Sequence, residues 1–536
     1  MTRRSLFAGA FLASPLARCL ASLAPESGAE SRARSALELR QRAAVLQRKR
    51  PLVLSTANGD EAALPNWIAC FTKGLPQNRF GEVAPAAYRS LLAAMGSGKR
   101  ADFERIPLGA GRKLVNPQAA FAFHLEGGDP HSFGIPPAPS ITSREAAMET
   151  SELYWQALCR DVPFSEYETS PLIRRAADHL RITPRAVFRG LTLGDLEGPY
   201  VSQFLLKPIP YGSGHIEQRY GVPLPGADYM TSVSEWTQIQ SGMPPWLEVS
   251  YDGSQRFVRT GRDLAKCVHY DFPYQVYLNA ALILLNTGPD TILNANPFKC
   301  LNNPYGNSHL PVVNSHPDEG FVTFGQAEIT DWLARVTTAA LKAAWCQKWM
   351  VHRRVRPEAL GGLVHYARTG ERSYPVASAL LESPAVEAIF ARTGTYLLPQ
   401  AYPEGSPLHP SYPAAHATVS GACSAILKAL FNEAMLLPGC VIPSADGLSL
   451  LPCKGYAPTV GAEVNKLASN IAMARNWAGL HYRSDDVAGL RLGEDVAISV
   501  LQDLVCTYTE EFKGFSFTRI DGTKVRVTPH AEVITG

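Results

Sequence analysis

Three segments that lie far apart in the chain carry basic and imidazole side chains that could together hold an oxyanion. They supply one lysine, two arginines and two histidines: Lys348, Arg356, His416, Arg475 and His481. Cationic groups and helix ends bind phosphate-like anions in proteins because both direct N–H donors and positive charge at the ligand. We therefore predict one site for a tetrahedral or trigonal oxyanion, built from all three segments.

The first segment, DWLARVTTAALKAAWCQKWMVHRRVRP, has the pattern of a helix that ends at Pro357. Its last turns place four side chains at spacings of 3, 4 and 4 residues: Trp345, Lys348, His352 and Arg356. Residues at these spacings share one face of a helix. The alternative is a solvated helix end, where cations suit the negative pole of the helix dipole.

The second segment, EGSPLHPSYPAAHATVSG, predicts an extended approach through Pro413 and a helix that begins between Ala414 and His416. The first N–H groups of a helix have no partner within it, and small side chains let them approach an anion. Ala414, Ala415 and His416 are thus expected to cradle the oxyanion, with His409 in the preceding turn. A plain helix start with surface or loop histidines is the alternative.

The third segment places Arg475 in the final turn of a helix that can stop at Gly479. His481 then falls in the connection to the next helix. The two side chains are six positions apart, which is roughly 240° around an ideal helix. They can reach one point only if the helix breaks between them, and Gly479 provides the break.

Ser484 is the expected N-cap of the following helix, with two acidic residues in its first turn, where negative charge is favoured. Asp485 or Asp486 can in addition orient a nearby histidine. The third segment therefore contributes a cation, an imidazole and a carboxylate to one place.

The elements that must position these residues are mainly α-helical. From about residue 273 the apolar spacing of three and four predicts long helices at 273–286, 326–355, 415–436, 462–478 and 485–512. Before that, shorter helices at 85–95, 144–160 and 169–180 alternate with Pro/Gly-rich stretches. The expected fold is a helical bundle with a few short β-hairpins, one of them around Asp521-Gly522 near the C-terminus.

Residues 1–25 are expected to be a targeting segment, 26–50 a linker or surface helix, and 51–536 one large domain. That domain divides into a loop-rich part at 51–265, the bundle at 266–512 and a C-terminal hairpin and tail at 513–536. The twin arginine and acid-poor start suit export or an organelle address, and the sequence leaves the choice open. Apolar runs such as 280–285 are far below the roughly 20 residues that span a bilayer, so no transmembrane helix is expected.

Composition excludes several other classes. Apolar residues make up 46% and charged residues 18% of the chain, which suits a globular enzyme. The formal charge is only +3 and no basic block carries interleaved aromatics, so no nucleic-acid partner is expected. The ten cysteines show no zinc spacing. Cys440 and Cys453 flank a short turn and can pair in an oxidising compartment, which the sequence leaves open.

This ordered set of motifs resembles the superfamily of type-2 phosphatidic acid phosphatases and vanadium haloperoxidases. The family patterns Lys…Arg-Pro, Pro-Ser-Gly-His and Ser-Arg-x5-His-x3-Asp appear here as Lys348 to Arg356-Pro357, Pro413-Ala414-Ala415-His416, and Ala474-Arg475 to His481 with Asp485. The lysine-to-arginine separation of eight and the stretches KWMVHRRVRPEALGG, NGDE, FTKGLPQNRFGEV, YQVYLNAALIL and EGSPLHPSYP resemble algal and cyanobacterial bromoperoxidases. The resemblance covers residues 51 to about 528.

Alanines replace family residues at three positions of these motifs. Ala414 and Ala415 stand where the pattern reads Ser-Gly, and Ala474 where many members have serine. Ala414 cannot donate a hydroxyl, and a hydrogen bond to a charged group contributes roughly 1.5–3 kcal/mol. The resemblance thus implies weaker vanadate binding, or an altered halide preference, by about tenfold to a hundredfold. The N–H of Ala415 remains available.

The resemblance implies the haloperoxidase fold and a vanadate cofactor held by Lys348, Arg356 and Arg475, with His481 as the axial ligand of vanadium. It also implies that His416 acts as acid/base when hydrogen peroxide reacts, and that Lys348 polarises the peroxide. The products are hypohalous acid and halogenated small organic acceptors. A homodimer or larger homo-oligomer is expected, while a calcium ion is possible but not predicted.

The same resemblance assigns supporting roles and leaves alternatives. His409 matches a histidine beside the cofactor of algal bromoperoxidases, which favours bromide or iodide over chloride. Trp345 is the other candidate for shaping the halide pocket, with core packing as the alternative, and Asp271 is expected to pair with an active-site arginine. The competing functions are an acid phosphatase that uses the same histidine as nucleophile, and a haloperoxidase-like protein with a weakened site.

Overall fold

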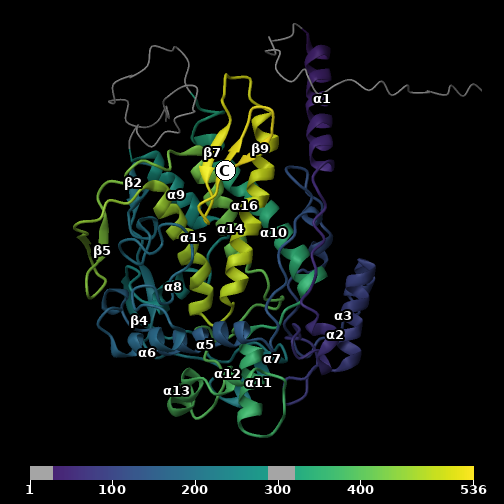
Figure 1. The fold of residues 1–536 in the computed structure, drawn as a ribbon, viewed down its shortest axis with the longest axis vertical. Helices are drawn as coiled ribbons and strands as arrows, with labels where there is room; N and C mark the ends of the chain where they lie inside the picture. The colour runs from purple at the N-terminus through teal and green to yellow at the C-terminus, as the bar shows by residue number, and fades with distance from the viewer. Residues whose placement is uncertain (1–27, 288–319) are drawn as a thin grey trace, which may run out of the picture.

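The computed structural model describes residues 28–287 and 320–536. The expected targeting segment at 1–25 lies outside the described residues. The fold is mainly α-helical, as predicted, with small antiparallel pairs of strands at its periphery. In Figure 1 the long helices of the C-terminal half stand side by side, and the shorter helices of both halves lie across their lower end.

The bundle consists of α9 (Gln275–Leu285), α10 (Gln326–Cys346), α14 (Ala415–Leu430), α15 (Val460–Trp477) and α16 (Arg483–Val505). Helix α14 lies at its centre, in contact with the other four helices. Every residue of α14 except His416 is buried. A helix that is apolar all round must be covered on all sides, and for this reason α14 occupies the middle of the bundle.

Glycines allow α14 and α16 to approach each other at backbone distance. A methyl group built on Gly421 would overlap the carbonyl oxygen of Leu490, and one built on Gly493 would overlap that of Thr418. Both helices therefore carry a glycine, which has no side chain, where they cross. The close packing fixes the start of α14 relative to the start of α16.

The remaining helices form the lower layer and the periphery. They are α1 (Ala29–Arg48), α2 (Asp60–Ala63), α3 (Pro85–Ser97), α4 (Arg100–Phe103), α5 (Arg144–Cys159), α6 (Pro171–Leu180), α7 (Val233–Gln240), α8 (Gly261–Cys267), α11 (Pro357–Arg368), α12 (Ser378–Leu381) and α13 (Pro384–Thr393). Helices α3, α5 and α6 confirm the three predicted from sequence. Helix α1 falls within the stretch 26–50, where a linker or surface helix was expected; it has no buried residue and projects from the body in Figure 1. No helix among the described residues is long and apolar enough to cross a membrane.

The described strands form three antiparallel pairs and one three-stranded sheet. Hairpins join β1 (Ile209–Tyr211) to β2 (Gly214–Ile216) and β5 (Val441–Pro443) to β6 (Leu450–Pro452), whereas β3 (Tyr220–Pro223) pairs with β4 (Tyr251–Arg256) across helix α7. The sheet has the order β7 (Phe515–Thr518), β8 (Lys524–Val527), β9 (Val533–Thr535). The predicted turn at Asp521-Gly522 joins β7 to β8, with Phe515 opposite Val527. Strand β9 was not expected.

The helix predicted over 326–355 is wrong in its last turns. Helix α10 ends at Cys346, a π-helical turn follows over Gln347–His352, and Arg353 is left-handed with φ 39°. The chain then runs extended, where Arg354 pairs with Cys70. Tertiary pairing thus overrides the helical pattern. Arg356 does not share a helix face with Lys348, because it precedes Pro357 at the N-cap of α11.

Two other boundaries differ from the prediction. Helix α14 ends at Leu430 rather than near 436, because Phe431 is extended. Helix α16 begins at Arg483 with Tyr482 as its N-cap, so Ser484 lies inside the helix. The carboxylate of Asp485 accepts the N–H of Tyr482 at 3.2 Å and takes the capping role that was expected of Ser484. The predicted break at Gly479, with φ 86°, is confirmed.

Cys440 and Cys453 lie opposite each other where the β5–β6 hairpin opens. The N–H of Cys453 donates to the carbonyl of Cys440 at 2.8 Å. No disulfide joins them in the structure, and their pairing stays a prediction.

We predict that Gly493→Ala destabilises the protein by about 2 kcal/mol, because an added methyl group overpacks the α14–α16 contact. Gly96→Ala is the matched control, since Gly96 is a helical glycine of α3 with nothing within 4 Å of a built Cβ. Chemical denaturation measures both. Equal stability of the two variants would show that the helices can separate without cost.

Candidate active site

The three predicted segments converge at one place on the bundle. Lys348 comes from the π-helical turn, Arg356 from the N-cap of α11, and Arg475 from the last turn of α15. His416 is the second residue of α14, and His481 lies between α15 and α16. The charges of Arg356 and Arg475 both act on Lys348, so the three cations are close neighbours.

Lys348 is completely buried and is held by carbonyl groups alone. Its Nζ donates to the carbonyls of Pro410 and Ser411, each at 2.7 Å. Burial, with the charges of Arg356 and Arg475, holds the pKa of Lys348 well below its usual range, although Asp485 opposes the shift. Among residues 28–287 and 320–536, no carboxylate forms an ion pair with this ammonium group.

Arg356 determines the protonation pattern of His481. The guanidinium donates to the carbonyls of His409 and Leu480, each at 2.9 Å, and it also lies 2.9 Å from Nε2 of His481 and 3.0 Å from Nδ1 of His409. A guanidinium has no acceptor atom, so Nε2 must accept and the ring proton resides on Nδ1. Burial lowers the pKa of Arg356 to about 9. The lone pair of Nε2 therefore faces the cations.

Asp485 holds the other side of the His481 ring. Nδ1 donates to the carboxylate of Asp485 at 2.8 Å, and the hydroxyl of Ser411 donates to the same oxygen at 2.5 Å. Burial would raise the pKa of Asp485, but Arg354 and His481 hold it well below its usual range. Asp486 has no recorded hydrogen bond to His481, so Asp485 is the carboxylate that orients the histidine.

None of the three site cations forms an ion pair with a carboxylate of the described residues. Elsewhere in the interior Lys73 lies 2.5 Å from Glu358, and Arg354 lies 2.7 Å from Asp485. Arg475 donates instead to the carbonyl of Val268 at 2.6 Å, and its buried Nε has no partner among the described residues. A buried charge is costly unless it is paired. The site is therefore suited to an anion.

The start of α14 offers two N–H groups rather than three. The N–H of Ala414 donates to the backbone carbonyl of Asp485 at 3.0 Å, so it is not free to cradle an anion as predicted. The reason is the close approach of α14 to α16. The N–H groups of Ala415 and His416 donate to no backbone carbonyl in the described part of the chain. The methyl group of Ala414 packs among the apolar residues Ala417, Ala468, Ala472 and Leu490.

His416 pairs with Asp271, at 3.1 Å between Nε2 and Oδ1. Asp271 was expected to bind an arginine, but Arg475 acts on it only through its charge. Burial alone would raise the pKa of Asp271, but the nearby His416 and Arg475 outweigh it, so the pKa lies below its usual value. The His416 side chain is 25% exposed, whereas those of the other basic site residues are buried. It lies where the site meets solvent.

His409 and Trp345 lie together beside Arg356. Their ring centroids are 4.9 Å apart, and Nδ1 of His409 is 3.0 Å from the guanidinium. Burial and the charges of Arg356 and Lys348 hold the pKa of His409 well below its usual range, so its ring is neutral. His352 faces Tyr412 and Gln347 instead and is not in the site.

Sequence reasoning missed three residues that support the site. Ser411 binds both Lys348 and Asp485, Arg354 binds Asp485, and Tyr402 lies beneath the guanidinium of Arg475 at 5.8 Å. Ser411 could have been noticed, because it lies within the stretch EGSPLHPSYP that carries part of the family resemblance. The partners of Arg354 lie 131 and 205 positions away in the chain, a distance that no local pattern bridges.

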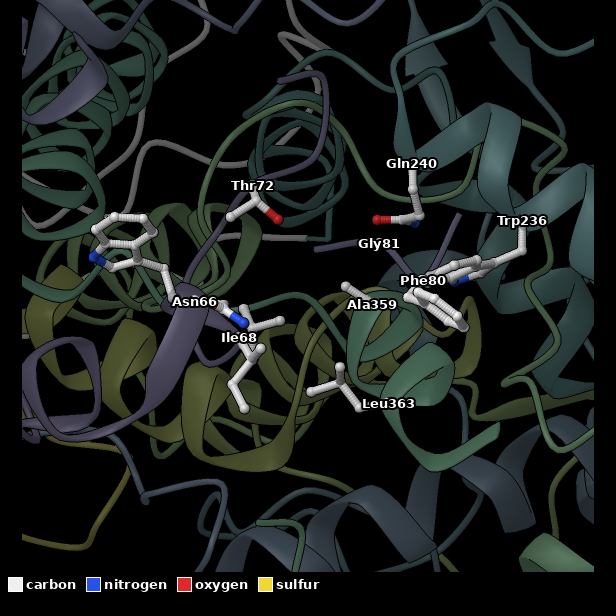
Figure 2. Close-up of a pocket in the computed structure, with 11 residues that line it drawn as sticks. Asn66, Ile68, Thr72, Phe80, Gly81, Trp236, Gln240, Ala359 and Leu363 are labelled. Carbon is white, nitrogen blue, oxygen red and sulfur yellow. The ribbon is translucent and has the colours of Figure 1, made fainter. Parts of the chain in front are cut away.

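A small pocket elsewhere has no such chemistry. Figure 2 shows it between the aromatic rings of Phe80 and Trp236 and the polar side chains of Thr72 and Gln240. None of its lining residues is acidic, basic or a histidine. The described residues also contain no group of three or more histidines, cysteines or carboxylates that could hold a metal ion. The cation cluster remains the candidate active site.

Comparisons with known proteins point to one family. A family model described as the VCPO second helical-bundle domain matches residues 333–508. A vanadium-dependent bromoperoxidase of Corallina officinalis is 33% identical, with 94% of this chain and 100% of the relative covered. One of Ascophyllum nodosum is 35% identical, with 86% of each covered.

A solved structure agrees with these relatives. The second vanadate-dependent bromoperoxidase of Ascophyllum nodosum, described as homohexameric, superposes with a TM-score of 0.87 at 28% identity. The match covers 98% of this chain and 96% of that chain.

We predict that Lys348 takes up a proton when orthophosphate binds this cluster. The uptake should be measurable at pH values below about 10.4, the ordinary pKa of a lysine. The lowered pKa of Lys348 lets the empty site lose a proton as pH rises, and the anion favours the charged form. Affinity should therefore fall with rising pH. Calorimetry in buffers of different ionisation enthalpy measures the uptake.

Lys348→Met should abolish this proton uptake, whereas Lys342→Met, at a partly exposed lysine of the preceding helix α10, should preserve it. Uptake that persists in Lys348→Met would assign the proton to another group.

Proposed function

This chain belongs to the vanadium-dependent haloperoxidase family, and on that premise we propose that the cation cluster is its vanadate site. The matched bromoperoxidases are covered almost to their full length. The protein is accordingly an oxidoreductase that oxidises halide with hydrogen peroxide. The observation that carries the site assignment is the set of buried cations, Lys348, Arg356 and Arg475, that have no carboxylate partner in the described residues.

The residues present fit vanadate. Arg475 has a buried Nε–H without a partner among the described residues, and in the same part of the chain the N–H groups of Ala415 and His416 donate to no backbone carbonyl. His481 presents the lone pair of Nε2 while Asp485 holds Nδ1–H, the arrangement in which a histidine binds a metal. When bound, vanadate supplies a Lewis-acidic centre that activates peroxide, and the oxidation state of the vanadium does not change.

Each of the chain's own groups then has a defined task. Lys348, Arg356 and Arg475 would balance the negative charge of vanadate, and His481 would bind the vanadium through Nε2. Nε2 of His416 is engaged by the ionised Asp271, so Nδ1 can take the proton of hydrogen peroxide and return it later. Lys348 is the cation placed to polarise the peroxide.

His409 and Trp345 form one wall of the site beside Arg356. We assign them to the halide and propose bromide or iodide over chloride, because the matched relatives are named bromoperoxidases. The acceptor would be a small organic molecule. A homo-oligomer is also proposed, because the matched structure of Ascophyllum nodosum is described as homohexameric.

The acid phosphatase alternative is not favoured, since the matched relatives are named bromoperoxidases. A weakened site is opposed by the intact arrangement of His481 with Asp485 and of His416 with Asp271.

We predict that purified protein halogenates a phenol indicator with peroxide and bromide only after incubation with orthovanadate. His481→Ala should lose at least about a hundredfold of this activity, because even residues that merely orient a metal ligand contribute up to that factor. His215→Ala, at an exposed position of β2, is the control. Running iodide and chloride in parallel ranks the halides.

Vanadate-independent hydrolysis of a phosphomonoester, with no halogenation for any halide, would contradict this function and favour the phosphatase.

We predict that Ala414→Ser raises vanadate affinity by about tenfold to a hundredfold, the value of one hydrogen bond to a charged group. Equilibrium dialysis of vanadate against the unloaded protein measures it. Ala417→Ser adds a hydroxyl to the same apolar cluster one turn along α14 and should not change affinity. If affinity stays constant in a folded Ala414→Ser, the hydroxyl has capped α14 instead.

A further inference from the structure

The candidate site approaches the surface on the side of His416. The side chains of Lys348, Arg356 and His481 are at most 2% exposed, whereas that of His416 is 25% exposed. Its partner Asp271 belongs to a surface segment that also carries Tyr270 and Phe272. A small neutral product that leaves past His416 therefore reaches this segment first.

Two separate connections place Tyr270 beside the site. It precedes Asp271 in the chain, and its ring stacks on His269 at 3.9 Å between centroids. His269 stacks in turn on Tyr402 at 3.7 Å, and Tyr402 lies beneath the guanidinium of Arg475 at 5.8 Å. The stack of rings thus runs from a site cation to a phenol that is 72% exposed.

Tyr270 is 72% exposed, although His269 stacks on its ring and the ammonium group of Lys266 lies over the ring at 4.4 Å from the centroid. An electrophile therefore reaches the ring carbons from the exposed edge. The neighbouring ring of Phe272 is 73% exposed but has no hydroxyl to activate it. Tyr270 is therefore the reactive aromatic group of this segment.

We propose that Tyr270 is a self-halogenation site, which rests on the proposed function as the source of hypobromous acid. A ring carbon ortho to the phenol hydroxyl attacks the bromine, and the bromine–oxygen bond breaks. The ring carbon then loses its proton, which combines with the released hydroxide to give water. The ring is oxidised, the hypobromous acid is consumed, and one bromine replaces one hydrogen.

Tyr211 is a matched control within the same chain. It is 70% exposed, so its accessibility nearly equals that of Tyr270, but it lies on the β1–β2 hairpin and contacts none of the site residues by any recorded interaction of the described chain. Product that escapes into bulk solvent should brominate the two tyrosines alike, whereas product emerging past His416 should modify Tyr270 first.

The experiment incubates the full-length, vanadate-loaded protein with peroxide and bromide and analyses its peptides by mass spectrometry for the bromine isotope pair. Tyr270 should be brominated at least about tenfold faster than Tyr211, because the reagent is produced next to it. An excess of a thioether that scavenges free hypobromous acid should suppress modification of Tyr211 and spare Tyr270. Added hypobromite without turnover should modify both at similar rates.

Equal rates during turnover, or modification of Trp345 before Tyr270, would overturn the proposal. A phenol indicator is halogenated in parallel under the same conditions. Indicator product with unmodified Tyr270 removes this inference alone, and no indicator product removes the proposed function together with it. Tyr270→Phe should retain indicator turnover and lose the modified peptide.

Discussion

Three positive charges buried side by side without a carboxylate partner are the constraint to which the rest of the described structure conforms. Such charges are tolerated only where other polar groups replace water, and here backbone carbonyls do so. Pro410 and Ser411 supply two to Lys348, His409 and Leu480 supply two to Arg356, and Val268 supplies one to Arg475. The loops at 268, 409–411 and 480 must therefore turn their carbonyls inward. Their conformations follow from the cations as much as from their own residues.

The carboxylates nearby are each committed to another partner. Asp485 binds Arg354 and His481, and Asp271 binds His416. If either one paired with Arg356 or Lys348 instead, the positive field would be cancelled and the site would have no preference for an anion. Arg354 contributes to this separation, because it binds Oδ1 of Asp485 at 2.7 Å while Oδ2 of the same carboxylate binds His481. Ser411 links the two regions, with its carbonyl on Lys348 and its hydroxyl on Asp485.

Periodicity and helix-end chemistry were sufficient to predict the long helices, the break at Gly479 and the convergence of three segments. They were not sufficient where a distant contact decides the outcome. The helix through Lys348 ends early because the strand-like residue Arg354 pairs with Cys70, nearly three hundred positions earlier, at a bridge that no local pattern encodes. The sequence predicted that Asp271 pairs with an arginine, whereas its carboxylate lies 3.1 Å from Nε2 of His416, a residue 145 positions away that no local pattern connects to it. The assignment of site roles to these residues remains a proposal.

The departure at Ala414 follows from the same packing that builds the bundle. Glycines on α14 and α16 bring the helices so close that the N–H of Ala414 donates to the carbonyl of Asp485. This hydrogen bond joins the start of α14 to the residue that orients His481. The N–H of Ala414 is therefore not available to an anion, and alanine has no hydroxyl to donate. An oxyanion would then be bound mainly by Lys348, Arg356 and Arg475, because charged donors form stronger hydrogen bonds than neutral donors. A site of this kind should depend on net charge more than on the geometry of the helix start, and it can tolerate alanine where a serine would otherwise be expected.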